Sequence, residues 1–326
     1  MNRSILWGIA NGAAAGALWG IIFLVPAVLQ GYTPVQLALG RYLAYGAIST
    51  VLLLPRLKRF SLRFGLRDWL TLAWLSVVGN LMYYALVAFA VQSAGGAATS
   101  LVVGLVPVVI AMATLSEPDT VALRRLAPAL AMSVAGVGLI AWQAFSTEAT
   151  SIPRGMRLLG LLCAAGALLS WSAYSIGNSR ALARRPDVTG HDWSLLTGLM
   201  TGVIALACIP LMLALPGATH TAGSWSVFWL TCTGVAVLAS ILGNACWNRA
   251  SRALPLSLSG QMIVFETLFA LLYAFAWQRR WPTGTECVAI VCLLAGVVLC
   301  ARAHLAKKRG AAGLKKSGSA LAHERD

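Results

Sequence analysis

The sequence predicts an all-α membrane protein in which ten transmembrane helices form two inverted five-helix repeats (5+5). Three observations carry this prediction: the composition, the spacing of apolar segments, and short sequence matches between the two halves. Of the 326 residues, 59% are hydrophobic and only 11% are charged, whereas soluble domains contain about 25% charged residues. The mean hydropathy of +0.77 agrees with a membrane protein. The composition therefore excludes a large soluble enzymatic domain.

Segments of about 20 mostly apolar residues are long enough to cross a bilayer. The chain contains ten of them, joined by short connections: 6–29, 35–54, 69–91, 96–115, 124–143, 157–177, 193–215, 226–248, 256–277 and 284–303. The first is too long for the apolar part of a typical signal peptide, so we assign it as a span. We expect a first repeat over 1–145, a second, inverted repeat over 155–303, and a disordered basic cytoplasmic tail over 304–326.

The distribution of Lys and Arg predicts the orientation. If both termini are cytoplasmic, the cytoplasmic segments hold 20 of the 25 Lys and Arg residues, and the outer loops hold four. This bias follows the positive-inside pattern, against which the pair Arg279 and Arg280 is the exception. We expect a multi-pass protein of the cell inner (plasma) membrane with the lipid bilayer as its surroundings. The net charge of +15 reflects this topology, and we expect no nucleic-acid partner.

Two short sequences recur at equivalent places in the two halves. AAGAL occurs at Ala14–Leu18 and again at Ala164–Leu168, in the first span of each half. SVVGN at Ser76–Asn80 is matched by SILGN at Ser240–Asn244, in the third span of each half. Because five is an odd number of spans, the second half must be inserted upside down. Inverted repeats are typical of secondary transporters, whose site lies near the membrane midplane.

Only two charged residues, Glu266 and Arg41, fall well inside apolar spans. A carboxylate at the centre of a span costs about 2.5–3.5 kcal/mol on insertion scales. One interpretation is a structural tie between helices. The interpretation that we favour is a substrate, ion or proton site, since intramembrane charges usually mark transport pathways.

Polar and aromatic residues recur three, four or seven positions apart in several spans, which places them on shared helix faces. Interhelical hydrogen bonding, worth about 0.6 kcal/mol on average, is the structural alternative. If these helix faces all line one cavity, a single feature explains the polar residues on all of them. A cavity with aromatic walls and few polar groups suits an amphipathic organic solute rather than a metal ion. The candidate substrate-binding residues are Trp19, Arg41, Asn80, Tyr83, Tyr84, Trp171, Tyr174, Asn178, Asn244, Asn248 and Glu266.

Catalytic sequence motifs are absent, and we expect no enzymatic activity, no cofactor and no metal site. The chain has no HExxH, no GxSxG and no P-loop, so ATP-driven pumping by this chain is disfavoured. The seven cysteines all lie in apolar segments without metal-ligand spacing. We expect them to be packed free thiols.

Two segments of the first half carry a resemblance to a known family. PVQLALGRYLAYG at Pro34–Gly46, with Arg41 followed by an aromatic residue, and LVPVVIAMATLSE at Leu105–Glu117, with Pro107, are similar to EamA-type exporters of the drug/metabolite transporter superfamily. The second half departs from the family pattern, since Glu266 stands about where a proline is usual. The resemblance covers 6–303 by architecture and fewer residues by motif.

The resemblance implies an inner-membrane carrier, often one that exports amino acids or related metabolites. LLLPRLKRF at Leu52–Phe60 and the Trp- and Tyr-rich spans resemble aromatic amino acid exporters. We therefore expect a secondary transporter that exports a small-molecule substrate, an amino acid or related metabolite, by alternating access. Alternatives are the same fold carrying nucleotide sugars or drugs, a channel or scramblase-like permease, and a non-transporting scaffold. Coupling to protons and formation of a homodimer stay open.

Overall fold

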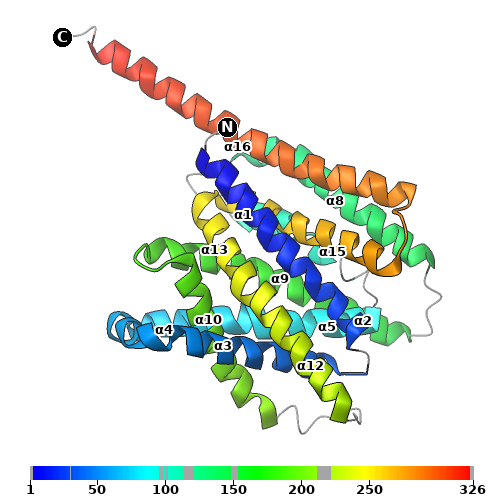
Figure 1. Ribbon diagram of the computed structural model, residues 1–326. Coiled ribbons are helices and arrows are strands. Elements are labelled where there is room, and N and C mark those ends of the chain that lie inside the picture. The colour runs from blue at the N-terminus through cyan, green and yellow to red at the C-terminus, as the bar shows by residue number, and fades with distance from the viewer. Residues whose placement is uncertain are drawn as a thin grey trace.

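The computed structural model describes residues 3–29, 31–94, 99, 102–113, 121–147, 153–210 and 222–323. Within these ranges every regular element is a helix and there is no strand. The expected all-α class is therefore confirmed. Figure 1 shows long helices packed against one another, with the C-terminal part of α16 projecting beyond the rest.

The first half of the chain begins with α1, which is extended by two short helical pieces. Its elements are α1 (Arg3–Gly20), η1 (Ile21–Leu24), α2 (Val25–Val28), α3 (Pro34–Arg63), α4 (Leu66–Ser76), η2 (Val77–Met82), α5 (Tyr83–Ala94), α7 (Val106–Ala113) and α8 (Leu123–Thr147). The second half contains α9 (Arg154–Arg184), α10 (Gly190–Ala207), α12 (Ala222–Val235), η3 (Ala236–Gly243), α13 (Asn244–Ala253), α14 (Leu256–Gln261), α15 (Ile263–Gln278) and α16 (Gly284–His323).

Local sequence explains where several helices begin and end. Thr33 and Gln36 form a capping box at the start of α3, and Pro34 occupies the first helical position. Thr189 caps α10, where its side chain accepts a hydrogen bond from the backbone N–H of Asp192. At the other end of a helix, α15 stops at Arg279, which adopts the left-handed conformation with φ of 50°.

Six stretches of the described residues are long and apolar enough to cross a membrane. They are Pro34–Arg56, Leu66–Ala94, Arg154–Arg184, Trp225–Ala253, Leu258–Trp277 and Gly284–Ala306, and each coincides with one of the ten expected spans. Of the other four expected spans, 6–29 contains most of α1, 124–143 lies in α8, and 193–215 contains most of α10, with 211–215 outside the described residues. The expected span 96–115 lies partly outside the described residues. A polytopic membrane protein is thus established.

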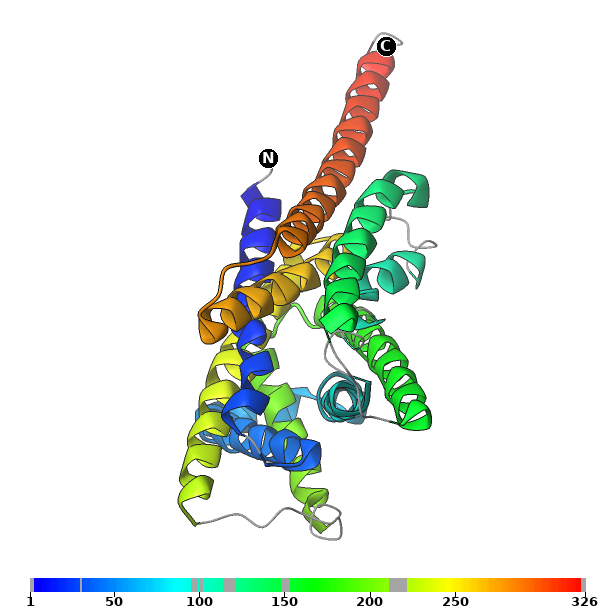
Figure 2. The same cartoon turned by 90° about the vertical axis from the view of Figure 1, so that its right-hand side faces the viewer.

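The C-terminal segment differs from the sequence expectation. We expected a disordered tail over 304–326, whereas α16 continues as one helix to His323. The segment is rich in Ala, Leu and Lys, which favour helix over coil. Nearer its start α16 packs along α8, as Figures 1 and 2 both show.

Two π-helical segments coincide with the two similar motifs of the sequence. The segment η2 begins directly after Ser76 and contains Asn80, and η3 contains Ser240 and ends directly before Asn244. In a π-helix the backbone bonds shift from i→i+4 to i→i+5, and such segments are frequent at functional sites. The repeated motif therefore coincides with a repeated and uncommon backbone geometry.

Side chains from helices far away in the sequence bond to the carbonyls of these π-helical segments. Ser170 of α9 donates its hydroxyl to the carbonyl of Val78 at 2.5 Å. Trp19 of α1 donates its indole N–H to the carbonyl of Ala239 at 3.0 Å. Each π-helical segment in one half is thus held by the first long helix of the other half, because a carbonyl in a buried helix needs a donor.

The glycine of each repeated motif lies at the same crossings. A Cβ on Gly79 would lie 2.1 Å from the ring of Tyr174, and a Cβ on Gly243 would lie 2.8 Å from the indole nitrogen of Trp19. Only glycine permits such a close approach without displacing the ring. These crossings bring the aromatic side chains of α1 and α9 against η3 and η2, where the candidate residues gather.

Candidate functional site

Five aromatic side chains from four helices form one cluster, which we call the aromatic cluster. The ring of Trp171 lies 5.2 Å from Trp19, 4.9 Å from Tyr83, 4.9 Å from Tyr174 and 6.3 Å from Trp247 between centroids. Trp19 also contacts Trp247 at 5.3 Å. Aromatic pairs at these separations favour edge and offset arrangements. Four of the five were expected from the sequence, and the structure brings them together.

Trp247 is the member of the aromatic cluster that the sequence analysis missed. Its side chain is only 1% exposed and packs against both Trp19 and Trp171. A signal was present, since Trp247 follows Ser240 by seven positions and Asn244 by three. That spacing places Trp247 on the same helix face as Ser240 and Asn244.

Arg41 lies in a buried position on α3, beside η3. Its side-chain Nε donates to the hydroxyl of Ser240 at 3.0 Å. The guanidinium lies 5.0 Å from the ring centroid of Tyr42 and 5.2 Å from that of Tyr84. Cation–π contacts compensate a buried arginine without neutralising its charge. These contacts hold the guanidinium of Arg41 in place, and all three partners are neutral groups.

Glu266 lies in α15, which packs along α1 where Gly16 allows the two backbones to approach closely. Its side chain is only partly buried, and it interacts electrostatically with Arg41 and with Tyr83. Among the described residues, Glu266 has no hydrogen bond and no ion pair within 4.0 Å. A carboxylate without a partner in the middle of an apolar helix is costly unless water or a ligand reaches it.

Asn80 and Asn244 occupy equivalent positions in the two repeated motifs. Asn80 donates its amide to the hydroxyl of Thr201 at 3.0 Å, and its backbone carbonyl accepts from the hydroxyl of Tyr42 at 3.1 Å. Beside Asn244, Ser194 of α10 donates its hydroxyl to the carbonyls of Ser240 and Ile241 in η3 at 3.2 Å. These contacts connect the π-helical segments to α3 and α10.

Asn178 and Asn248 lie together and have no hydrogen bond to Arg41 or Glu266 among the described residues. The amide of Asn178 donates to the side-chain oxygen of Asn248 at 2.9 Å. Trp193 donates its indole N–H to Asn178 at 2.8 Å, and Asn248 donates to the carbonyl of Gly190 at 3.2 Å. Much of the hydrogen-bonding capacity of this pair is used within the protein, which fixes α9, α10 and α13 relative to one another.

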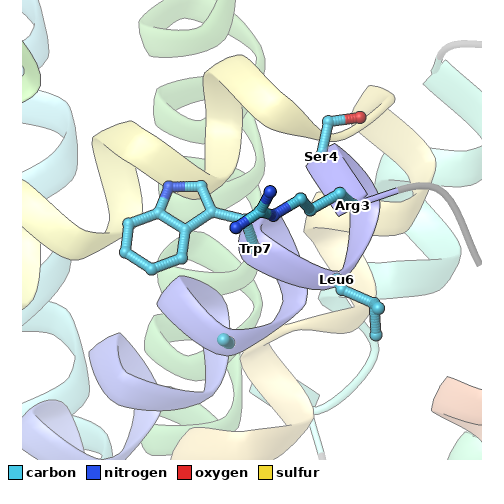
Figure 3. Close-up of a pocket in the computed structure, with 5 residues that line it drawn as sticks. Arg3, Ser4, Leu6 and Trp7 are labelled. Carbon is cyan, nitrogen blue, oxygen red and sulfur yellow. The ribbon is translucent and has the colours of Figure 1, made fainter.

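A separate surface hollow lies at the start of α1. Its volume is about 560 Å³, and Figure 3 shows Arg3, Ser4, Leu6 and Trp7 around it. None of the candidate substrate-binding residues lines it. The hollow is therefore distinct from the aromatic cluster and from the two intramembrane charged residues, Arg41 and Glu266.

Metal binding and disulfide chemistry find no support in the part of the chain that the structure describes. No group of three or more His, Cys, Asp or Glu side chains could hold a metal ion there. All seven cysteines are free thiols, but only Cys232 and Cys300 are buried and Cys287 is exposed, so the expected packing holds for part of the set. What the site offers is the unpaired carboxylate of the partly buried Glu266, a buried guanidinium and aromatic walls. Such a site can bind and orient a small solute, and it lies within the apolar helices of a polytopic membrane protein.

Known proteins place this chain in a family. Residues 158–302 match the EamA-like transporter family. The chain is 33% identical over 307 residues to "Inner membrane protein YtfF" of Escherichia coli (strain K12), which covers 91% of this chain and 95% of that protein. The chain belongs to the EamA-like transporter family of the drug/metabolite transporter superfamily, as its sequence resemblance indicated. It is a membrane transporter and not an enzyme.

A solved structure supports the fold independently of close sequence similarity. The chain superposes on the crystal structure of another protein with a TM-score of 0.70 and 19% sequence identity. The match covers 90% of this chain and 96% of the other. At this identity the likeness shows the fold alone.

Proposed function

We propose that this protein is a secondary carrier that exports amino acids or related small amphipathic metabolites by alternating access. The observation that carries the proposal is Glu266, a partly buried residue whose carboxylate has no hydrogen bond or ion pair among the described residues and lies within electrostatic reach of the buried Arg41. A zwitterionic solute presents one group to each of these charges. The neighbouring aromatic cluster supplies the apolar surface that an amphipathic solute needs.

In this proposal the ten spans form two inverted halves, 1–145 and 155–303, which move relative to each other around the site. The similar π-helical segments η2 and η3, each held by a helix of the other half, support this arrangement. The site comprises the residues predicted from the sequence, in which the asparagines orient polar groups and the aromatic residues form walls. We place both termini in the cytoplasm from the charge distribution, and the inner membrane from the name of the Escherichia coli relative.

Ion pairs between the two halves on the arginine-rich face would favour a state closed on that face. Arg185 bonds to Asp68 at 2.8 Å and packs over the ring of Phe64 at 4.1 Å. Arg56 bonds to Asp192 at 2.5 Å. In both pairs one partner precedes residue 145 and the other follows residue 155. The pairs are partly exposed, so each contributes only about 0.2–1 kcal/mol.

Asp68→Asn is expected to change the rate of transport by about 1.4- to 5-fold with little change in the half-saturating concentration, since it weakens one closed state only slightly. Asp187→Asn is the matched control, because Asp187 bonds to the same Arg185 at 3.0 Å within one half. Arg185 holds the pKa of the Asp187 carboxyl below its usual range, so that contact stays charged at neutral pH and is lost only as pH falls through the lowered pKa. Equal effects of both variants on the initial rate would contradict a role for contact between the halves.

The proposed function is tested by uptake and counterflow of labelled amino acids into proteoliposomes containing the purified protein. We expect saturable flux of at least one amino acid and stimulation by unlabelled substrate on the opposite side. Flux that rises linearly with concentration would indicate a channel instead. The absence of flux for every amino acid would reject the substrate class and redirect the assay to nucleotide sugars and drugs. A rate independent of pH would count against proton coupling.

A further inference from the structure

Two tryptophans of the aromatic cluster have buried indole N–H groups without an acceptor. Trp171 is 7% exposed and Trp247 is 1% exposed. Among the described residues, neither indole nitrogen has a hydrogen-bond partner. A buried donor left unsatisfied costs about 1–3 kcal/mol, so such groups are uncommon without a ligand or water to accept their hydrogen.

The other tryptophan of the cluster shows the contrast. Trp19 packs against both Trp171 and Trp247, yet its own indole N–H donates to the carbonyl of Ala239 at 3.0 Å. Trp193, outside the cluster, likewise donates, to Asn178 at 2.8 Å. The fold thus supplies an acceptor to each of these two indoles. It leaves two adjacent indoles of the cluster without one.

Two serines extend the same pattern along α9 and α13, which pack against each other. Ser175 follows Trp171 by four positions, and Ser251 follows Trp247 by four, so each serine shares a helix face with its tryptophan. Both hydroxyls are buried and have no partner among the described residues. Two neighbouring helices therefore each present an indole N–H and a hydroxyl whose hydrogen bonds are unmade.

The chemistry around these donors selects an uncharged acceptor. The contacts of Arg41 are with Ser240, Tyr42 and Tyr84, and not with the tryptophans. A carboxylate placed between the indoles would have no adjacent cation, and burial of an uncompensated charge is far more costly than burial of a neutral oxygen. Tyr83 contacts Trp171 and interacts electrostatically with Glu266. The donors are therefore next to the charged part of the site but outside it.

We propose that the indole N–H groups of Trp171 and Trp247 bind a neutral oxygen acceptor, such as a hydroxyl, on the transported solute and so determine specificity. This inference rests on the proposed function and deepens it. The charged ends of the solute lie at Glu266 and Arg41, and its uncharged polar end reaches the two indoles. A site built to hydrogen-bond a hydroxyl discriminates strongly against an analogue that lacks it, because the donors are then left unpaired.

The test uses two pairs of amino acids that differ by one hydroxyl, threonine with valine and tyrosine with phenylalanine. Each unlabelled compound competes for saturable flux of a labelled amino acid in proteoliposomes of the wild-type protein. We expect the hydroxyl-bearing member of at least one pair to compete about 10-fold more strongly or better, which corresponds to one hydrogen bond of about 1.4 kcal/mol. This measurement needs no variant, so it cannot fail through misfolding.

Trp171→Phe and Trp247→Phe then remove the unpaired donors while keeping an aromatic ring. We expect each to reduce the preference for the hydroxyl-bearing member to about 3-fold or less. Trp193→Phe is the matched control, because Trp193 lies outside the aromatic cluster and its N–H is already bonded to Asn178, so this variant should retain the preference. A second measurement follows the indole ¹⁵N–¹H signals of the wild-type protein during titration with threonine or tyrosine. The signals of Trp171 and Trp247 should shift and that of Trp193 should not.

The outcomes separate this inference from the proposed function. Saturable flux without any preference within either pair would overturn the inference and leave the carrier function standing. The same holds if the preference survives in both Trp171→Phe and Trp247→Phe, since water alone would then occupy the donors. Absence of saturable amino acid flux in the wild-type protein would reject the proposed function and this inference with it.

Discussion

Replacing Glu266 by glutamine is expected to raise the half-saturating substrate concentration about 10- to 100-fold without unfolding the protein. A hydrogen bond to a charged group contributes about 1.5–3 kcal/mol, and each 1.4 kcal/mol is a factor of ten. Since the carboxylate has no partner among the described residues, its replacement removes no visible contact. The melting temperature should stay constant or rise, because an unpaired charge in an apolar helix is costly.

Glu286→Gln is the matched control for this prediction. Glu286 lies at the start of α16, where it accepts from Arg280 at 2.7 and 2.8 Å and from the backbone N–H of Thr283 at 2.7 Å. Its replacement should lower the melting temperature and leave the half-saturating concentration unchanged. If Glu266→Gln changes only the half-saturating concentration and Glu286→Gln changes only the melting temperature, Glu266 acts in binding and Glu286 in stability. Unchanged flux in Glu266→Gln would instead make Glu266 a structural tie.

The relation between the two intramembrane charges is testable by exchange. No ion pair within 4.0 Å joins Arg41 to Glu266, and Arg41 is already held by Ser240 and two tyrosine rings. We therefore expect the double variant Arg41→Glu/Glu266→Arg to have no more flux than either single variant. Restored flux would show that the two side chains pair directly during the transport cycle.

The parts of this molecule that could be predicted from the sequence are those with a local physical cause. Apolar length predicts spans, and the cost of a charge in lipid singles out Glu266 and Arg41. The spacing on α9 predicts that Trp171 and Tyr174 share a helix face, and the structure places both rings in the aromatic cluster. In each case the relevant interaction is with solvent or with a residue within two helical turns.

The parts that could not be predicted depend on contacts between distant segments. The motifs SVVGN and SILGN match in sequence, but nothing within them requires a π-helix. Carbonyls of the π-helical segments accept from donors such as Ser170 and Trp19, which lie 92 and 220 residues away in the chain. Likewise, the lack of an acceptor for Trp247 is a property of its neighbours and not of its own helix.

One packing signal was present in the sequence but was not used in our prediction. Gly198 and Gly202 form a GxxxG pattern within an apolar segment, which permits close approach of two helices. In the structure α10 packs along α3 at this place, and a Cβ on Gly198 would lie 2.1 Å from the hydroxyl of Ser49. The partner helix could not have been identified, because α3 lies more than 100 residues earlier in the chain.

This crossing gives the largest expected effect on stability. A Cβ on Gly202 would lie 2.4 Å from the Cα of Gly46, and a Cβ on Gly46 would lie equally close to the Cα of Gly202. No side chain can move aside, since each glycine faces the backbone of the other. Forcing extra atoms into a packed interior costs about 1–3 kcal/mol for small additions and more for branched ones. We expect Gly202→Ala to lower the melting temperature in detergent by about 5 °C, and Gly202→Val to prevent accumulation of folded protein.

The control for the crossing is Gly234→Ala in α12, where an added Cβ would meet no atom within 4 Å. Since alanine favours helix over glycine by about 1 kcal/mol, this variant should be equally stable or more stable. Replacement of glycine by alanine is thus expected to lower the melting temperature at Gly202 and to maintain or raise it at Gly234. If Gly202→Ala melted at or above the wild-type temperature, α3 and α10 could not approach each other as closely as the structure describes. Since this contact joins the proposed halves, a graded loss of transport through the series glycine, alanine, valine would also indicate that the crossing is needed for function.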